Sequence, residues 1–341
     1  MTIDARVPHR FLAPAKVNLH LRVGPPRPDG FHPLLSWMCT VGLFDTLEIR
    51  FERAGDAGIA LAIDPASATP ADDHGARPSG QGGATESHVP VDGRNLVVRA
   101  ADAWVRATAV AGEEGSGRPA LPGRVSVVLG KRIPVGAGLG GGSSDAARTL
   151  LALDAIAAVG GAAPTSRQRL CDLAATLGSD VPFFVFGPSA ACRGRGEVVT
   201  PITPPRPRWA VLVLPPVHMP TPAVYRQFDA MGLGRNADVD AAPEWAAWAR
   251  LPATELLPLL VNDLEPPAFA LRPDLGELRL QCERVVERPV RMSGSGSSLF
   301  TLFDDEQDAR AAAARLTHAV EVRTEAVELC PHDELTQRPS A

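Results

Sequence analysis

The part of the sequence most suited to chemistry is a run of five glycines within seven residues, a pattern that can cradle phosphate. The glycines are Gly136, Gly138, Gly140, Gly141 and Gly142. A glycine has no Cβ, so the backbone amides around it can approach a polyanion closely. The sequence therefore predicts a phosphate-binding loop over residues 134–144.

The segments on either side of this loop fit the same purpose. Residues 124–129 have the character of a β-strand, and residues 145–153 that of a helix that opens with Ser143, Ser144 and Asp145 as capping residues. The loop would therefore deliver an anion to a helix N-terminus. Unpaired amides and the helix dipole both favour phosphate at such a place.

Three other interpretations of the loop fit less well. A P-loop needs a lysine directly after its last glycine, and Gly142 is followed by Ser143. The dinucleotide fingerprint G-x-G-x-x-G fits the spacing from Gly136 to Gly141, but residues 165–177, which follow, look helical and offer no acidic strand end. A flexible connector is disfavoured because both flanking segments have regular periodicity.

Only two lysines occur among the 34 basic residues, and both lie near recognisable motifs. Lys131 stands beside Arg132 at the end of a predicted strand, where we expect an exposed charge without a special role. Residues 15–23 alternate strictly between apolar and polar, which predicts a strand whose polar face carries Lys16, Asn18, His20 and Arg22. Such a face is usually wetted by solvent, but beside a phosphate loop it would place an ammonium and an amide at the rim of a cleft.

One aspartate, Asp180, lies at a junction between two predicted elements. Residues 165–177 have helical periodicity and end at Gly178, where we expect a left-handed stop. Residues 183–186 are apolar and are predicted to form a strand. Asp180 is then either a turn-forming residue or, with a lysine nearby, a catalytic base.

Length and composition are those of a globular enzyme without a membrane segment. The chain has 341 residues, of which 45% are hydrophobic, and a net charge of −5, which disfavours nucleic acid as a partner. No apolar run is long enough to span a bilayer. Five scattered cysteines without a C-x-x-C motif argue against structural zinc and indicate a reducing compartment, so we expect a cytoplasmic location.

A second tract of glycine and serine occurs near the C-terminus, at residues 292–298. It leads into a predicted strand at 299–303, a helix at 305–318 and a strand at 320–327, an order that resembles half of a ferredoxin-like unit. Its glycines are more typical of a turn that lets two backbones approach than of a substrate contact.

Three motifs in order resemble those of the galactokinase, homoserine kinase, mevalonate kinase and phosphomevalonate kinase superfamily, the GHMP kinases. They are residues 13–19, the glycine loop, and residues 293–296. Three further motifs resemble the branch of that superfamily that acts on 4-diphosphocytidyl-2-C-methyl-D-erythritol in the non-mevalonate isoprenoid pathway. They are residues 29–32, 178–184 and 220–225. The resemblance covers most of the chain, apart from an insertion near residues 64–92.

The resemblance implies an α/β (α+β) protein with the two-domain GHMP kinase fold. Residues 1–203 would form an N-terminal, ribosomal-S5-like ATP-binding domain, and residues 204–341 a C-terminal ferredoxin-like domain, with a cleft between them. Residues 53–93 and 231–252 look like insertions or connectors, to which we assign no chemistry. A monomer or weak homodimer is expected, with no nucleic-acid or membrane partner.

Carried over residue by residue, the resemblance implies that Lys16 and Asp180 are the catalytic pair. Asp180 would accept the proton of the alcohol, and Lys16 would offset negative charge on the transferred phosphoryl group. The loop would bind ATP, with Mg²⁺ bridging its phosphates and Ser144 as a hydroxyl on the metal side. The residues assigned to ATP are Pro134, Val135, Gly136, Ala137, Gly138, Leu139, Gly140, Gly141, Gly142, Ser143 and Ser144.

The resemblance also implies where the substrate, a small molecule with a cytidine diphosphate moiety, would bind. Asn18 would be a polar contact beside the catalytic pair. Phe31 and Tyr225, the only tyrosine of the chain, would stack on the two faces of the cytosine ring, and His32 would meet its polar edge. Family members commonly have tyrosine in place of Phe31. On residue type alone, these three could equally be a core aromatic, a loop histidine and a helix-packing tyrosine.

Together these inferences predict an ATP-dependent kinase that phosphorylates the 2-hydroxyl of 4-diphosphocytidyl-2-C-methyl-D-erythritol and releases ADP. Another GHMP kinase, of the mevalonate or homoserine type, is the nearest alternative. A non-catalytic nucleotide sensor would keep the loop but not the chemistry, and the retention of both Lys16 and Asp180 speaks against it. A nicotinamide oxidoreductase, which the dinucleotide fingerprint would imply, should bind NAD tightly.

Overall fold

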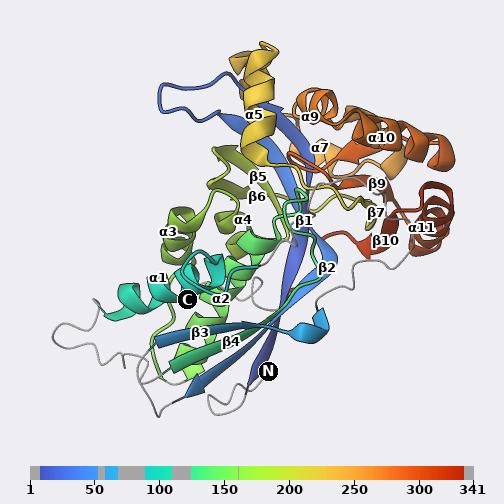
Figure 1. The fold of residues 1–341 in the computed structure, drawn as a ribbon. Helices are drawn as coiled ribbons and strands as arrows, with labels where there is room; N and C mark the ends of the chain where they lie inside the picture. Colours follow the sequence, from blue (N-terminus) through green and yellow to red (C-terminus); the bar gives the residue numbers. More distant parts are fainter. Residues whose placement is uncertain (1–7, 53–57, 68–88, 110–123, 160, 334–341) are drawn as a thin grey trace, which may run out of the picture.

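The computed structural model describes residues 8–52, 58–67, 89–109, 124–159 and 161–333. Most of the predicted insertion near residues 64–92 therefore lies outside the described residues. Within the described residues, two sheets and the helices packed on them form a mixed α/β fold (Figure 1). No helix of these residues has the length and apolar character needed to cross a membrane.

The first sheet is built on two long antiparallel strands, β1 (His9–Val23) and β2 (Leu34–Glu52), which extend through most of the molecule (Figure 1). Its order is β3-β4-β2-β5-β6, and β1 also pairs with β2. The other strands are β3 (Gly58–Ile63), β4 (Arg124–Gly130), β5 (Ser189–Gly194) and β6 (Val198–Pro201). The strand predicted over residues 124–129 is confirmed as β4.

Four helices pack against this sheet and form the first hydrophobic core with it. They are α1 (Leu96–Ala109), α2 (Gly141–Val159), α3 (Arg167–Leu177) and α4 (Val181–Phe186). Nearly every side of α2 is buried, because α1, α3, α4 and β1 all contact it. The glycine loop, which runs into α2, is therefore attached to one of the most enclosed helices of the fold.

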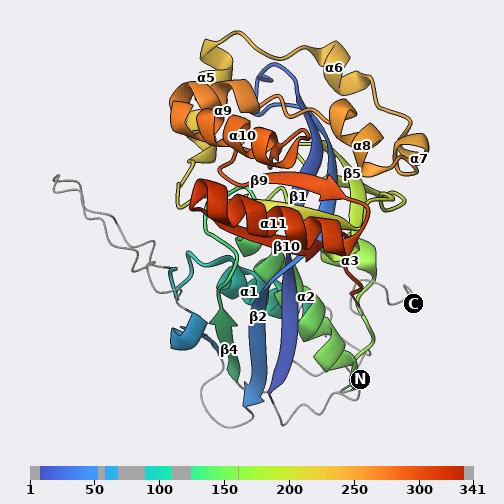
Figure 2. The same ribbon diagram turned by 90° about the vertical axis from the view of Figure 1, so that its right-hand side faces the viewer.

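The second sheet has four strands in the order β10-β7-β9-β8. They are β7 (Trp209–Leu214), β8 (Arg291–Met292), β9 (Leu299–Phe303) and β10 (Arg323–Glu328). Two helices, α10 (Pro273–Val286) and α11 (Glu306–Val320), lie side by side on its outer side (Figure 2). The strand predicted at 299–303 is confirmed, and the predicted helix is α11, whose N-cap Asp305 accepts a hydrogen bond from the amide of Asp308 at 2.9 Å.

Between β7 and α10, the chain forms a series of shorter helices. They are α5 (Thr221–Ala230), α6 (Asn236–Asp240), α7 (Trp245–Trp248), α8 (Ala253–Leu256) and α9 (Glu265–Leu271). The predicted connector at residues 231–252 thus contains α6 and α7. The helix α5 contacts α9 and carries Tyr225 towards the first sheet.

The two sheets share a core that joins the halves of the molecule. Along β7, Ala210, Leu212 and Leu214 pack with residues of β1 and β2, whereas Val211 and Val213 pack with the C-terminal helices. Because successive side chains of a strand point to opposite faces of the sheet, β7 has buried residues on both faces of the second sheet. The domain boundary proposed between residues 203 and 204 falls just before β7. Because β7 shares a hydrophobic core with β1 and β2, the two proposed domains pack against each other and are not joined by a linker alone.

Three local predictions differ from the structure. Residues 183–186 belong to the helix α4 and not to a strand, because an apolar run of this length fits either element and Pro182 suits a first helical turn. Gly178 has φ of 173°, which is extended backbone and not a left-handed stop. The helix α2 begins at Gly141, so Ser143, Ser144 and Asp145 lie within the helix and do not precede it.

Candidate active site

Lys16 lies in the middle of β1 and is only 3% exposed. Its Nζ donates a hydrogen bond to Oδ1 of Asn18 and lies 3.6 Å from Oδ2 of Asp180. A buried ammonium is stable only with such partners, because burial alone strongly disfavours its charged form. The structure thus brings together the two side chains that were predicted to form the catalytic pair.

The amide of Asn18 is held at both ends. Besides accepting from Lys16, it donates through Nδ2 to Oγ of Ser36 at 2.8 Å, and that hydroxyl donates to the carbonyl of His20 at 2.9 Å. Because β1 and β2 are paired here, this chain of hydrogen bonds fixes the direction of the Lys16 side chain. The predicted contact between Asn18 and substrate stays a prediction.

Asp180 immediately precedes α4, whose first turn contains Pro182. The proline fixes the backbone at the start of the helix and so fixes where the aspartate side chain projects. That side chain is 33% exposed, against 4% for the side chain of Lys16. The carboxylate can therefore meet a ligand from solvent while the ammonium behind it stays enclosed.

The glycine loop is fastened to the second glycine-serine tract. Oγ of Ser293 donates to the carbonyl of Gly138 at 3.0 Å and accepts from the amide of Asn18 at 3.2 Å. A Cβ on Gly138 would come 2.1 Å from the carbonyl oxygen of Ser293, and the residue has φ of 77°. The prediction that residues 292–298 let two backbones approach is therefore confirmed.

A single cavity of about 900 Å³ collects the predicted residues. Its lining includes both members of the catalytic pair and all four predicted substrate residues, namely Lys16, Asp180, Asn18, Phe31, His32 and Tyr225. Every predicted ATP-binding residue except Leu139 and Ser144 also lines it. Those two side chains are buried instead, because the loop turns them into the core.

The three residues predicted to hold cytosine all line this cavity, and two of them are in ring contact. Phe31 is 48% exposed, which does not fit a core aromatic. The rings of His32 and Tyr225 are 5.0 Å apart, and the imidazole lies between the carbonyl of Gly24, 2.9 Å from Nδ1, and Oδ1 of Asp229, 3.4 Å from Nε2. Burial raises the pKa of the Tyr225 hydroxyl, and the negative charge of Asp180 raises it further.

Lys131 was expected to be an ordinary exposed charge, and this expectation is wrong. Its side chain is 13% exposed, lines the cavity and forms ion pairs with Asp45 and with Asp145, the latter at 2.9 Å. Burial lowers the pKa of Lys131, but the two carboxylates outweigh it and raise the pKa overall. Burial also raises the pKa of Asp145, and the neighbouring charge of Asp45 adds to the increase.

The predicted polar face of β1 holds only for its first two members. A register shift between Asn18 and His20 turns the strand, so that Leu21 lines the cavity. His20 faces the other way, where its ring lies 5.4 Å from that of Trp248. Arg22 donates to Oδ1 of Asp263 at 2.9 Å. A bulge of this kind leaves no signal in the alternation of residue types.

A magnesium ion is implied by the phosphate loop, and one residue offers it an atom. Within the described part of the chain, no group of three or more His, Cys, Asp or Glu side chains could hold a metal. Oγ of Ser144 is buried and has no hydrogen-bond partner. An orphaned hydroxyl in the first turn of α2 fits Mg²⁺, which takes most of its ligands from phosphates and water. Because Ser143 lines the cavity and Ser144 does not, the metal contact stays a prediction.

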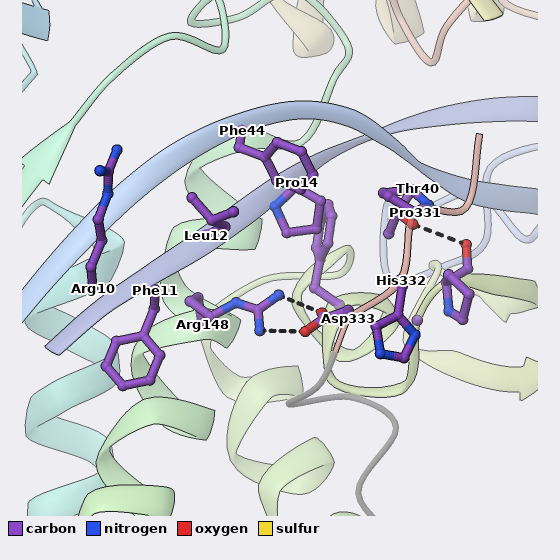
Figure 3. A pocket seen from close by; sticks show the side chains of 13 residues that line it. Arg10, Phe11, Leu12, Pro14, Thr40, Phe44, Arg148, Pro331, His332 and Asp333 are labelled. Atoms are coloured by element: carbon purple, nitrogen blue, oxygen red, sulfur yellow. Dashed lines mark hydrogen bonds and ion pairs between the residues drawn. The ribbon is translucent and has the colours of Figure 1, made fainter. Parts of the chain in front are cut away.

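A smaller hollow of about 220 Å³ lies between β1, β2, α4 and residues 331–333 (Figure 3). Arg148 of α2 donates there to both carboxylate oxygens of Asp333, at 3.0 and 2.5 Å. The ion pair ties the C-terminal segment to the helix that follows the glycine loop. None of the predicted site residues lines this hollow.

Comparison with known families matches both halves of the chain. The family described as "GHMP kinases N terminal domain" matches residues 95–188, and the one described as "GHMP kinases C terminal" matches residues 248–322. The first match contains the glycine loop and Asp180, and the second contains the tract at residues 292–298.

Curated relatives cover nearly the whole chain. A Nocardioides sp. protein named 4-diphosphocytidyl-2-C-methyl-D-erythritol kinase is 38% identical over 312 residues, which are 90% of this chain and 92% of the relative. A Thermus thermophilus protein of the same name is 39% identical over 306 residues, 89% of this chain and 91% of the relative.

Solved structures agree in fold. A crystal structure of 4-(cytidine 5'-diphospho)-2C-methyl-D-erythritol kinase has a TM-score of 0.66 and 35% identity, covering 95% of this chain and 100% of that one. A homoserine kinase from Cytophaga hutchinsonii has a TM-score of 0.64 and 14% identity, covering 96% of each chain, and is similar in fold alone.

Proposed function

Because the chain belongs to the family of 4-diphosphocytidyl-2-C-methyl-D-erythritol kinases, within the GHMP kinases, we propose that Lys16 and Asp180 catalyse phosphoryl transfer from ATP to the 2-hydroxyl of that alcohol. One observation carries the proposal. A single cavity is lined by the lysine-aspartate pair, the glycine loop and the three residues suited to a cytosine ring. The protein is an ATP-dependent small-molecule kinase of the non-mevalonate isoprenoid route.

In this mechanism, Asp180 acts on the acceptor. An alcohol is a weak nucleophile at neutral pH, so a carboxylate within hydrogen-bond reach accepts its proton as the bond to phosphorus forms. Asp180 is suited to this task because its side chain is one-third exposed to the cavity and Pro182 fixes its position. Lys16, 3.6 Å behind it, supplies a positive charge that offsets the charge on the transferred phosphoryl oxygens.

The glycine loop would hold the triphosphate of ATP. Glycines 136, 138 and 140 have positive φ, which turns successive amides towards the cavity without an obstructing Cβ. The N-terminus of α2 adds the positive end of its dipole. When bound with ATP, Mg²⁺ would neutralise phosphate charge, and Ser144, whose hydroxyl has no hydrogen-bond partner, would be the metal ligand from this chain.

Phe31, His32 and Tyr225 would bind the cytidine end of the acceptor. Two aromatic rings can enclose a flat base at low entropic cost. The imidazole of His32 is oriented by Gly24 and Asp229, so it presents a fixed polar edge to the base. The substrate would then extend from these residues to Asp180.

The proposal is tested by ADP release from the purified protein with a panel of alcohols. With 4-diphosphocytidyl-2-C-methyl-D-erythritol, ADP and the 2-phosphate should form in equal amounts. Turnover with mevalonate or homoserine alone would mean that the specificity lies elsewhere among the GHMP kinases. Binding of ATP without transfer to any alcohol would instead favour a nucleotide sensor.

We also propose that the enzyme works in the cytoplasm as a monomer or weak homodimer. All five cysteines are free and buried, which suits a reducing compartment. The catalytic pair, the glycine loop and the cytosine-binding residues all come from one chain, so catalysis needs no second copy. Light scattering across a range of protein concentrations would test the oligomeric state.

A further inference from the structure

One turn of the first sheet lies against two residues assigned to the acceptor substrate, Phe31 and Asp180. Residues 195–197 connect β5 to β6. A Cβ on Gly196 would lie 3.6 Å from Oδ1 of Asp180, so this turn packs directly against the proposed catalytic base. The neighbouring residue, Arg195, places its guanidinium carbon 4.7 Å from the centre of the Phe31 ring. The turn therefore contacts Phe31 through Arg195 and packs on the proposed catalytic carboxylate at Gly196.

The guanidinium of Arg195 has donors to spare. Among the described residues, its only ion pair is with Glu197, where Nε and Oε1 are 3.7 Å apart. That carboxylate already accepts a hydrogen bond from the Arg195 amide at 2.6 Å, which shapes the turn. The Arg195 side chain is 38% exposed and lines the cavity. An arginine held in this way can offer a planar pair of N–H groups to an anion.

The chemistry of the proposed substrate puts an anion at this place. If the cytosine ring lies against Phe31 and the accepting hydroxyl lies at Asp180, the diphosphate that links them must cross the space between. Two phosphate groups there carry negative charge close to the carboxylate of Asp180. A cation is needed beside them, and Arg195 is the cavity-lining residue that touches Phe31 and belongs to the turn packed on Asp180.

We propose that Arg195 binds the diphosphate of the acceptor substrate and thereby selects a nucleoside-diphosphate-linked alcohol over a free alcohol. This inference rests on the proposed function, which supplies the positions of the two ends of the substrate. Arg195 is then a specificity-determining residue that acts on binding. It does not move a proton or contact the transferred phosphoryl group.

The test compares Arg195→Gln with Arg193→Gln. Arg193 belongs to the same segment, donates to the carbonyl of Val239 at 3.3 Å and does not line the cavity, so its variant removes one charge without touching the site. For Arg195→Gln, loss of a charge-assisted contact should raise KM for the diphosphocytidyl substrate about 30-fold while kcat changes little. Arg193→Gln should keep both constants, and Arg195→Lys should recover part of the lost affinity.

Binding measurements separate the diphosphate from the base. Titrations of CDP and of cytidine, each with saturating ADP to fill the ATP side, should show that Arg195→Gln weakens CDP but leaves cytidine nearly unchanged. Equal weakening of both ligands, or a fall in kcat without a change in KM, would overturn the proposal. Failure of the wild-type protein to phosphorylate the diphosphocytidyl alcohol would instead refute the proposed function. The CDP titration would still show whether Arg195 binds a diphosphate.

Discussion

At the level of single residues, the two members of the proposed catalytic pair, Lys16 and Asp180, differ in burial. The ammonium is enclosed by Asn18 and the glycine loop, so its charge acts at short range and is little screened by water. The carboxylate is partly exposed and can meet an incoming hydroxyl. A pair in which both members were buried would be inaccessible to substrate, whereas an exposed pair would lose most of its electrostatic effect to solvent.

Asp180→Asn should reduce kcat by about 1,000-fold, because a general base typically contributes 10²- to 10⁴-fold. ATP affinity should be nearly unchanged, since the amide is of the same size and the glycine loop is untouched. Steady-state kinetics and a nucleotide titration measure the two effects. The exposed Asp172→Asn on α3 is a suitable control and should retain the wild-type rate. Asp180 is not the base if its variant keeps most of the rate.

At the level of elements, the proposed active site depends on two loops that contact each other. The glycine loop is fixed on one side by Ser293, which also contacts β1, and on the other by the amide of Lys16, which donates to the carbonyl of Leu139 at 2.9 Å. The amide of Ser298 donates to the carbonyl of Ala137 at 3.1 Å. Each of these contacts needs close approach of backbones. The position of the phosphate cradle relative to β1 is therefore a property of the junction and not of the loop alone.

Gly138→Ala should disrupt this junction, because the added Cβ would meet the Ser293 carbonyl and the residue would keep a left-handed φ. We expect a lower melting temperature and weaker ATP binding. Gly142→Ala is the matched control for stability: its Cβ would lie 3.8 Å from Leu96, and alanine is favourable in the first turn of α2. Equal melting temperatures for the two variants would show that the junction is not tight.

The connection from β4 into the glycine loop depends on a buried carboxylate of β2. Asp45 is fully buried and accepts hydrogen bonds from the amides of Arg132 and Ile133, at 2.6 and 2.9 Å, as well as from Lys131. Asp45→Asn should lower the free energy of unfolding by about 3–5 kcal/mol, because it removes one charge of a buried ion pair and turns an NH2 donor towards the ammonium of Lys131. Urea unfolding measures the loss. The surface variant Asp92→Asn should change stability far less.

At the scale of the whole molecule, sequence patterns located the motifs but not all of their partners. Periodicity predicted β4, α3 and β9, and the ordered motifs predicted which segments would meet, because such signals lie within short stretches of chain. The ion pairs of Lys131 were missed because Asp45 lies far away in sequence and neither residue has a local signature. The bulge in β1 was missed because a twist of the backbone leaves the order of residue types unchanged.

That bulge places a histidine at the contact between the two halves of the fold. The ring of His20 lies 6.0 Å from that of Trp245 and 5.4 Å from that of Trp248, both in α7, and its Nδ1 accepts a hydrogen bond from the amide of Val261 at 3.3 Å. Burial and, to a smaller extent, the positive charge of Arg22 lower the pKa of His20 to about 4. Protonation would place a charge among aromatic rings and remove the acceptor.

Stability should therefore depend on pH through His20. Between about pH 6.5 and 4 the unfolded chain binds a proton that the folded chain does not, so the contribution is complete above pH 6.5 and is lost as the pH falls through this window. The loss is on the order of 3 kcal/mol. Urea unfolding from pH 4 to 7.5, compared between wild type and His20→Gln, isolates this residue because other titrating groups cancel in the difference. The difference should shrink towards acid pH. A difference that does not change with pH would mean that β1 and α7 do not enclose a neutral imidazole.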